Sequence, residues 1–429
     1  MNAITASPFH RGEQAIQSRL GVRDKMERFG QQVIRDYLPQ EHRGFYQQLP
    51  YILAGHADSN GWPWASMLFN QSSLMVSPHP EVLNINAKPV AGDPLLNSLS
   101  EGLRVGLLGI ELETRRRNRI SAHIEEVSET GLSLGIDQAF GNCPQYIQPR
   151  TLTWLDAAPA PEAEHNVEEI TAFDHDALKL IGCSDTFFVA SSLGREDNEA
   201  SDGADVSHRG GDSGFVRIDD MHTLTIPDYS GNLHFNTLGN FLENPKAGLL
   251  FVDFEKGHML TMTGTVEILW AAEDLDGFVG AERLWKFTLD HGYWLRHVLP
   301  MRWNKNTDAP VIRPAVFNEI EGKETKVEKP DNLDIAEEAI VSFVDSGVEQ
   351  AWSDDEDGTL LEFAEDHGLT PAFGCRAGSC GACKVQLLSG NIVYEKEISA
   401  PVNDGEILIC CALPANNMEG KTAMLKIKL

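Results

Sequence analysis

Five cysteines near the end of the chain have the residue type and spacing that could bind a metal cluster. Cys375, Cys380 and Cys383 follow a C-x4-C-x2-C spacing, and Cys410 and Cys411 stand further along the chain. Three thiolates at this spacing, completed by a distant fourth, are typical of the ligands of a [2Fe–2S] cluster. Because such a cluster carries electrons singly, these residues predict electron transfer.

The residues between these cysteines are small, as a cluster of this kind requires. Backbone N–H groups must reach its sulfurs, and bulky side chains would keep them away. Gly378, Ser379, Gly381 and Ala382 meet that need. Two alternatives stay open for these thiols, a structural zinc site and disulfide bonds. Structural zinc usually takes two separated C-x2-C pairs or added histidines, and disulfide frameworks belong to short secreted chains.

Residues 340–429 resemble the β-grasp ferredoxin domain. The resemblance rests on the cysteine loop and on the stretch 407–414, where Cys410 stands four residues before Pro414, as in the ferredoxin pattern. It implies a cluster held by Cys375, Cys380, Cys383 and Cys410. Cys411 is then expected to be a small buried residue.

The same part of the chain predicts the elements that would hold the cluster loop. Residues 340–343 and 348–352 are expected to form an opening hairpin. Apolar residues three and four apart in 358–364 indicate a helix that packs on the sheet. Residues 384–388 and 424–427 would supply later strands.

The charge of the chain limits its partners. The 429 residues include 35 Lys and Arg against 64 Asp and Glu, a net charge of −29, which argues against nucleic acid or an anionic membrane as the partner. Residues 319–367 alone contain 17 acidic residues and three lysines. This stretch is either a solvated face that aids solubility or a docking surface that steers a basic redox partner.

No run approaches the roughly 18 apolar residues that would span a membrane, and the N-terminus lacks a charged start followed by an apolar block. We therefore expect a cytoplasmic protein.

Residues 49–268 contain an internal repeat at an interval of about 140 residues. Residues 51–54 correspond to 187–190, and residues 106–113 correspond to 248–255. Each copy consists of short apolar stretches separated by turn residues, which indicates paired β-barrels and not a parallel sheet. The predicted fold class is therefore mainly β with α+β: a duplicated barrel followed by the ferredoxin-like domain.

The second copy resembles the pyridoxamine 5'-phosphate oxidase family. Residues 233–251, LHFNTLGNFLENPKAGLLF, are similar to the family stretch FYTNLGS…ENPRVALLF. The resemblance covers most of residues 40–300 and implies a split β-barrel that binds FMN, as in the flavin-nucleotide-binding branch of the family. It also implies a homodimer as one assembly, since the family usually binds FMN across a dimer interface.

The resemblance also implies which residues contact FMN, whose phosphate needs cations, hydroxyls and backbone amides. Arg209 would take the place of a phosphate-binding lysine, since an arginine can hold a phosphate with two parallel N–H bonds. The implied cofactor-binding residues are Ser207, His208, Arg209, Asn236, Thr237 and Asn240.

One departure from the family leaves the phosphate short of positive charge. The family continues into an Arg-Lys pair where this chain has Phe241 and Leu242. Arg209, Arg217 or the run of arginines at 115–119 would have to supply the missing charge. If the two copies pair as a pseudo-dimer, the run from the first copy could reach the second.

Few residues are candidates for proton transfer beside the flavin. His208 and Asp228 are the weak catalytic candidates, and hydrogen bonding to the cofactor is the alternative role for the histidine. Cys143 and Cys183 are isolated and expected to be packed, since neither has a basic neighbour in the sequence that would lower its pKa.

Four segments are expected: an N-terminal helical segment (1–48), the barrel region (49–317, with halves at about 49–150 and 170–300), an acidic linker (318–338) and the ferredoxin-type domain (339–429). In the first segment, the apolar residues of 11–38 recur at helical spacing until Pro39 ends it. The sequence contains no G-x-G-x-x-G motif, so nothing in it indicates a dinucleotide-binding fold.

These parts together predict an oxidoreductase that uses FMN and a [2Fe–2S] cluster. It would transfer electrons between a reduced donor, such as NAD(P)H, a reductase or a small organic substrate, and a redox protein partner such as a reductase or oxygenase component. The alternative is a non-catalytic redox carrier or sensor whose barrel binds flavin or haem.

Overall fold

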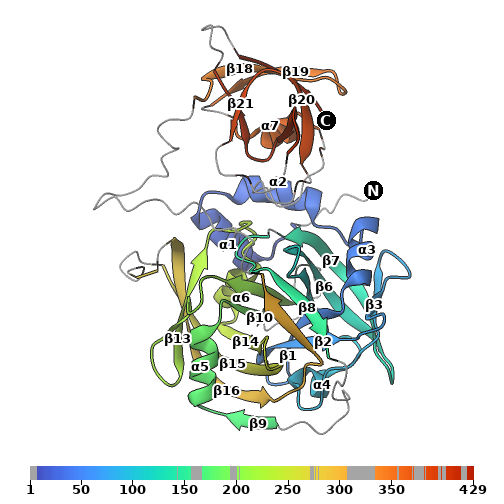
Figure 1. Ribbon diagram of the computed structural model, residues 1–429, viewed down its shortest axis with the longest axis vertical. Helices are drawn as coiled ribbons and strands as arrows, with labels where there is room; N and C mark the ends of the chain where they lie inside the picture. Colours follow the sequence, from blue (N-terminus) through green and yellow to red (C-terminus); the bar gives the residue numbers. More distant parts are fainter. Residues whose placement is uncertain are drawn as a thin grey trace. The chain divides into compact units, whose positions relative to one another are not determined.

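The chain forms two compact units, Met1–Val311 and Ile312–Leu429 (Figure 1). The computed structural model describes residues 7–142, 144–155, 167–193, 201, 203–270, 275, 277–278, 280–306, 334–354, 357–369, 371, 381, 383–394, 398, 402–416 and 423–429. The loop with Cys375 and Cys380 therefore lies outside the described residues, as does Cys143.

The first half of the N-terminal unit is an antiparallel sheet with the strand order β2-β1-β5-β6-β7-β4-β3. Its strands are β1 (Tyr51–Ala57), β2 (Pro63–Phe69), β3 (Met75–Val76), β4 (Val82–Ile85), β5 (Arg104–Glu111), β6 (Arg116–Val127) and β7 (Leu132–Asn142). Alternating apolar residues such as Ile52, Leu107 and Leu134 point inward and form one hydrophobic core.

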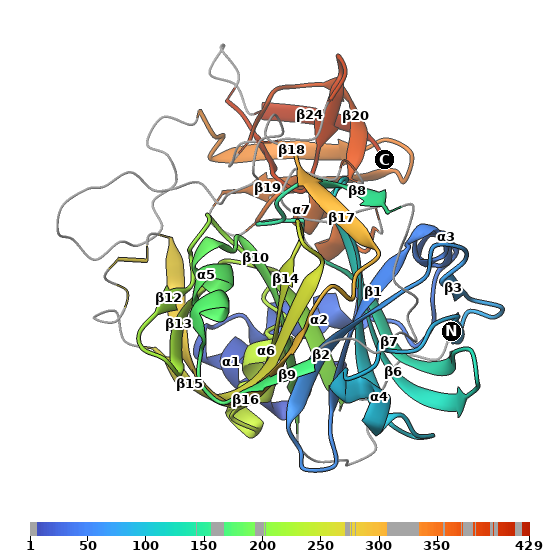
Figure 2. The same ribbon diagram turned by 60° about the horizontal axis from the view of Figure 1, so that its bottom comes forward.

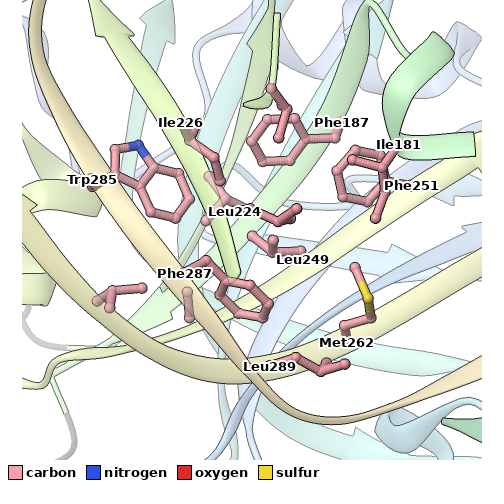
Figure 3. Packing of buried hydrophobic residues seen from close by; sticks show 14 of the residues in the cluster. Ile181, Phe187, Leu224, Ile226, Leu249, Phe251, Met262, Trp285, Phe287 and Leu289 are labelled. Atoms are coloured by element: carbon pink, nitrogen blue, oxygen red, sulfur yellow. The ribbon is translucent and has the colours of Figure 1, made fainter. Parts of the chain in front are cut away.

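The second half repeats this topology with the order β11-β10-β14-β15-β16-β13-β12. Its strands are β10 (Thr186–Ser192), β11 (Ala204–Gly210), β12 (Arg217–Ile218), β13 (Thr223–Tyr229), β14 (Lys246–Asp253), β15 (His258–Leu269) and β16 (Ala281–Leu295), with β9 (Val167–Ile170) added at β16. Large side chains such as Phe187, Trp285 and Phe287 fill the interior of this half (Figure 3).

The two halves therefore confirm the duplicated split barrel that the repeat predicts. The strand pairing corrects one of the two correspondences by one residue. Gly55 pairs with Gly106 as Ala190 pairs with Gly248, so β1 corresponds to β10 with Tyr51 at the position of Thr186 and not of Phe187. A shift of one residue exchanges the two faces of a strand, and an apolar run that is buried on both faces hides this shift in the sequence.

The halves pack on each other through equivalent strands (Figure 2). A Cβ on Gly106 would lie 2.6 Å from the backbone oxygen of Ala204, and a Cβ on Gly248 would lie 2.4 Å from that of Pro63. These equivalent contacts mark a pseudo-twofold relation. The outward faces of both sheets share a third hydrophobic core that includes Leu53, Leu108, Phe188 and Leu250, so the unit is an intramolecular pseudo-dimer.

Short helices and a separate hairpin complete this unit. The helices are α1 (Arg11–Arg19), α2 (Arg23–Val33), α3 (Gln40–Gln48), α4 (Pro94–Ser98), α5 (His175–Cys183) and α6 (Asn236–Glu243), and the hairpin pairs β8 (Arg150–Trp154) with β17 (Met301–Lys305). The helical spacing in 11–38 is confirmed by α1 and α2. Cys183, at the end of α5, is exposed, which corrects the expectation that it is packed.

The C-terminal unit has the strand order β19-β18-β24-β20-β22, with a small second sheet of β21 and β23. Its elements are β18 (Glu338–Phe343), β19 (Val348–Ser353), α7 (Leu360–Asp366), β20 (Lys384–Ser389), β21 (Ile392–Tyr394), β22 (Glu406–Leu408), β23 (Ala412–Pro414) and β24 (Ala423–Lys428). The predicted hairpin, helix and later strands are all present. In the described part of the chain, none of the helices has the length and apolar character needed to cross a membrane.

A buried aspartate in the first half makes the stability of the folded protein depend on pH. Asp93 is 1% exposed. Its Oδ1 accepts hydrogen bonds from Ser66 Oγ (2.6 Å) and Leu95 N (2.9 Å), while Oδ2 has no hydrogen-bond partner among the described residues. Burial raises the pKa of Asp93 to about 6.

Replacing Asp93 by asparagine is expected to remove this contribution to the pH dependence of stability. The pKa of Asp93 in the folded protein lies above that of an unfolded aspartate, so protonated Asp93 stabilises the folded state. This contribution to the unfolding free energy is complete below about pH 4 and is lost as the pH rises through 6. The amide of the D93N variant keeps an acceptor oxygen for both hydrogen bonds. We expect the unfolding free energy of the wild type to fall by about 1–2 kcal/mol relative to D93N between pH 5 and pH 8, measured by urea unfolding. A difference independent of pH would contradict this assignment.

Candidate functional site

A polar pocket of about 110 Å³ opens where the two halves of the N-terminal unit meet. Strands β6 and β7 of the first half and β11, β13 and the start of α6 in the second half supply much of its wall, and connecting segments such as 145–146 and 230–233 also line it. Five of the six predicted cofactor-binding residues line it, namely Ser207, His208, Arg209, Asn236 and Thr237. These five residues, from two separate stretches of the sequence, therefore lie around one cavity.

Two arginines from the first half supply positive charge to this pocket. Arg117 and Arg119 both line it, and both come from the arginine run at 115–119. Arg116 lies instead with its guanidinium 4.7 Å from the ring centroid of Phe45, and Arg217 pairs with Asp219 at 2.7 Å. The pseudo-dimer thus brings part of the run to the second copy, as the sequence allowed.

Arg119 is the centre of a hydrogen-bond network at one end of the pocket. It donates to Asn236 Oδ1 at 2.9 Å and to Ser207 Oγ, and it lies 3.1 Å from the carboxylate of Asp205. Ser207 Oγ lies 2.7 Å from Thr237 Oγ1. Both hydroxyls also lie 3.1 Å from Asp205 Oδ2. A guanidinium, two hydroxyls and an amide are groups that bind a phosphate, and here they already surround one carboxylate.

His208 contributes a buried donor to the pocket. Its Nδ1 lies 3.3 Å from Arg117 Nη1. Since a guanidinium only donates, Nδ1 must accept, and the ring proton of the neutral imidazole then resides on Nε2. That Nε2 is buried without a hydrogen-bond partner among the described residues. An unpaired buried donor is costly unless a ligand accepts from it.

The electrostatics keep His208 uncharged. Burial, and then the positive charge of Arg117, hold the pKa of His208 well below its usual value. A neutral imidazole with its proton on Nε2 can donate a hydrogen bond but is a poor proton donor at neutral pH. Of the two roles considered for His208, hydrogen bonding to a ligand therefore has the stronger support.

Arg209 and Asp228 form an ion pair in the lining of the pocket. Arg209 Nη1 contacts Asp228 Oδ1 at 2.5 Å, and Arg283 Nη1 contacts Asp228 Oδ2 at 2.8 Å. This pairing neutralises much of the charge that Arg209 was expected to offer to a phosphate. It also engages both oxygens of Asp228. Arg119 is likewise paired with one carboxylate, that of Asp205, but it also contacts the hydroxyl of Ser207 and the amide of Asn236.

Helix α6 begins at the pocket in an unusual backbone conformation. Phe235, at its N-cap, has a φ of 64°, and Leu233 has a φ of 60°. Left-handed backbone at bulky residues is strained and tends to occur at functional sites. The N-cap residue Phe235 makes no side-chain capping hydrogen bond, so the positive end of the helix dipole adds to the field at this end of the pocket.

Asn240, the sixth predicted residue, does not line this pocket. It lines a smaller adjacent cavity of about 30 Å³ together with Glu13, Arg119 and Asn236, and its Nδ2 donates to Ser191 Oγ at 3.0 Å. Glu13, on α1, was missed in the sequence, since a single glutamate on an amphipathic helix carries no signal of its own.

Two tyrosines also line the main pocket. Tyr146 and Tyr229 stack with ring centroids 5.2 Å apart, and the hydroxyl of Tyr146 donates to Ser230 O at 2.9 Å. Both residues line the cavity. The lining therefore includes the groups around Arg119, which we call the cationic end, and an aromatic pair, and neither tyrosine was singled out in the sequence.

In the C-terminal unit, strand pairing brings two of the predicted cluster cysteines together. Lys384 of β20 pairs with Leu408 of β22, and Ile409 N donates to Cys383 O at 3.3 Å. Cys383, Cys410 and Cys411 are all buried in the core of this unit. Cys410 Sγ lies 3.6 Å from Cys411 Sγ.

Comparison with known proteins identifies a family match in the C-terminal unit. The model of the 2Fe-2S iron-sulfur cluster binding domain matches residues 343–415. The uncharacterized ferredoxin-like protein YfaE of Escherichia coli (strain K12) is 35% identical over 65 residues, which are 15% of this chain and 77% of that protein.

Two further similarities cover parts of the chain. The stachydrine N-demethylase reductase subunit Stc4 of Rhizobium meliloti is 39% identical over 88 residues, which are 20% of this chain and 24% of that protein. The structure of a putative pyridoxamine 5'-phosphate oxidase from Lactobacillus delbrueckii covers 25% of this chain and 95% of its own, at 17% identity and a TM-score of 0.21.

Proposed function

Because the chain belongs to the 2Fe-2S ferredoxin family through residues 343–415, we propose that it is an oxidoreductase that couples an FMN in its N-terminal unit to a [2Fe–2S] cluster. When bound, the flavin accepts or gives up two electrons and the cluster carries one at a time. The chain would thus link a two-electron donor or substrate to a one-electron protein partner.

The observation that carries the flavin assignment is the cationic end of the main pocket. Arg119, Ser207 and Thr237 converge there at the uncapped start of α6. His208 Nε2, which has no hydrogen-bond partner among the described residues, would be a further donor to a ligand oxygen or ring nitrogen. The stacked tyrosines Tyr146 and Tyr229 in the lining would add aromatic contacts for a planar ring. These groups fit a phosphate monoester that carries a planar ring.

In the C-terminal unit, the described residues fit the cluster. Cys383 and Cys410 lie in a buried apolar environment joined by strand pairing, and we assign them as ligands with Cys375 and Cys380. The core around them would exclude water from the thiolates, which is one of the properties that tunes the potential of a cluster.

Only one flavin site is proposed per chain, because the equivalent place in the first half lacks cations. The counterparts of Ser207, His208, Arg209, Arg117 and Arg119 are Ser66, Met67, Leu68, Met259 and Thr261. Met67, Leu68 and Met259 are buried in hydrophobic cores. An anion there would meet apolar side chains.

The partner is proposed to be a basic redox protein. Stc4, a reductase subunit by its name, is 39% identical over 88 residues. In the described part of this unit, acidic residues such as Glu338, Glu349 and Asp354 have few cationic neighbours in the sequence. Such a surface would raise the association rate with a basic partner, and added salt would lower it.

The test is the absorption spectrum of the purified chain, with iron and FMN quantified before and after anaerobic addition of NAD(P)H. We expect about two irons and about one FMN per chain. Bleaching of both chromophores would support an enzyme that accepts electrons from NAD(P)H directly. A cluster with no flavin, even after incubation with excess FMN, would overturn the flavin assignment.

A further inference from the structure

Helix α1 crosses α6 at a contact between two glycines. A Cβ on Gly12 would lie 2.2 Å from Gly239 O, and a Cβ on Gly239 would lie 2.7 Å from Glu13 N. Side chains at these positions would force the helices apart, so the crossing depends on glycine at both. The contact places Glu13 of α1 beside the first turn of α6, where the main pocket begins.

Glu13 is fixed in this position by a capping box. Its Oε2 accepts from the backbone N of His10 at 2.8 Å, and the ring of His10 accepts in turn from Gly12 N at 3.1 Å. The side chain is almost fully buried. Glu13 Oε1 is therefore presented to α6 in one orientation.

A relay of hydrogen bonds leads from Glu13 to the cationic end of the pocket. Asn236 Nδ2 donates to Glu13 Oε1 at 2.5 Å, and Asn236 Oδ1 accepts from Arg119 Nη1 at 2.9 Å. A carboxyl oxygen on one side and a guanidinium on the other leave the amide only one favourable orientation. Glu13 thereby fixes the oxygen that holds Arg119.

We propose that Glu13 is a positioning residue for anion binding, which holds the guanidinium of Arg119 toward a phosphate through Asn236. The proposal rests on the proposed FMN site and goes beyond it by making the N-terminal helix a part of that site. It also assigns the effect of Glu13 to the phosphate and not to the flavin ring.

The test compares FMN with riboflavin, which has the same ring and lacks the phosphate. In E13A the amide of Asn236 loses its acceptor and can rotate, so Arg119 loses one of its three contacts, while those with Ser207 and Asp205 remain. We expect the Kd for FMN to rise about tenfold, the size expected for the loss of one hydrogen bond to a charged group. The Kd for riboflavin should change less than about twofold, as measured by quenching of flavin fluorescence.

Arg11 provides the matched control. It joins the same two helices through a contact with Glu243 that does not reach the pocket. The variant R11A should leave the ratio of the two dissociation constants unchanged. An equal loss of both ligands in E13A would overturn the positioning role and indicate that α1 merely stabilises the unit. If the wild type binds neither ligand, it is the proposed FMN function that fails.

Discussion

Replacing Arg119 by methionine is expected to weaken FMN binding by about a hundredfold. The guanidinium is buried at the cationic end of the pocket and donates to Ser207 and Asn236. Charge-assisted hydrogen bonds to a phosphate contribute about 1.5–3 kcal/mol each, and every 1.4 kcal/mol is tenfold in Kd. The loss would also leave the nearby carboxylate of Asp205 unpaired, which would repel the phosphate.

The control for this variant comes from the same strand. Arg116 precedes Arg119 on β6 but lies over Phe45, outside the residues that line the pocket. R116M should therefore bind FMN like the wild type. Titration of both variants with FMN checks the prediction, and equal affinities would place the phosphate elsewhere in the pocket. The natural place would then be beside Arg209, as the family resemblance implied.

Much of the fold could be predicted because repeated strands leave a pattern in the sequence. Two short correspondences were enough to indicate the duplication, and the glycines Gly106 and Gly248 mark where the halves approach each other. The exact residue-by-residue correspondence between β1 and β10 could not be predicted from the sequence, because both strands are buried on both faces and have no polar alternation.

The candidate site was predicted less completely, because charge pairing depends on the tertiary structure. The deficit of cations after Asn240 drew attention to the arginine run, of which Arg117 and Arg119 line the pocket, yet only the structure separates Arg119 from Arg116. The pairing of Arg209 with Asp228 joins residues of β11 and β13, two strands that do not pair directly with each other. Glu13 is still further from the other site residues in sequence. It reaches Asn236 only because α1 and α6 cross at Gly12 and Gly239.

The assignment of the fourth cluster ligand leads to the second large expected effect. C410A should lose the cluster, with iron falling below about a tenth of the wild-type content, because a [2Fe–2S] centre needs four ligands. C411A should keep the iron and the visible absorption. Both substitutions remove one buried sulfur from the same core, so any general loss of packing would affect the two variants alike.

The two variants therefore control for each other. Cys410 Sγ and Cys411 Sγ are only 3.6 Å apart, so burial and distance alone do not separate them. The distinction rests on the position of Cys410 relative to Pro414 and on the hydrogen bond from Ile409 N to Cys383 O, which ties the preceding residue to a predicted ligand. Loss of iron in C411A with retention in C410A would exchange the two assignments. Retention in both would mean that either thiol can complete the cluster, and the double variant should then lose it.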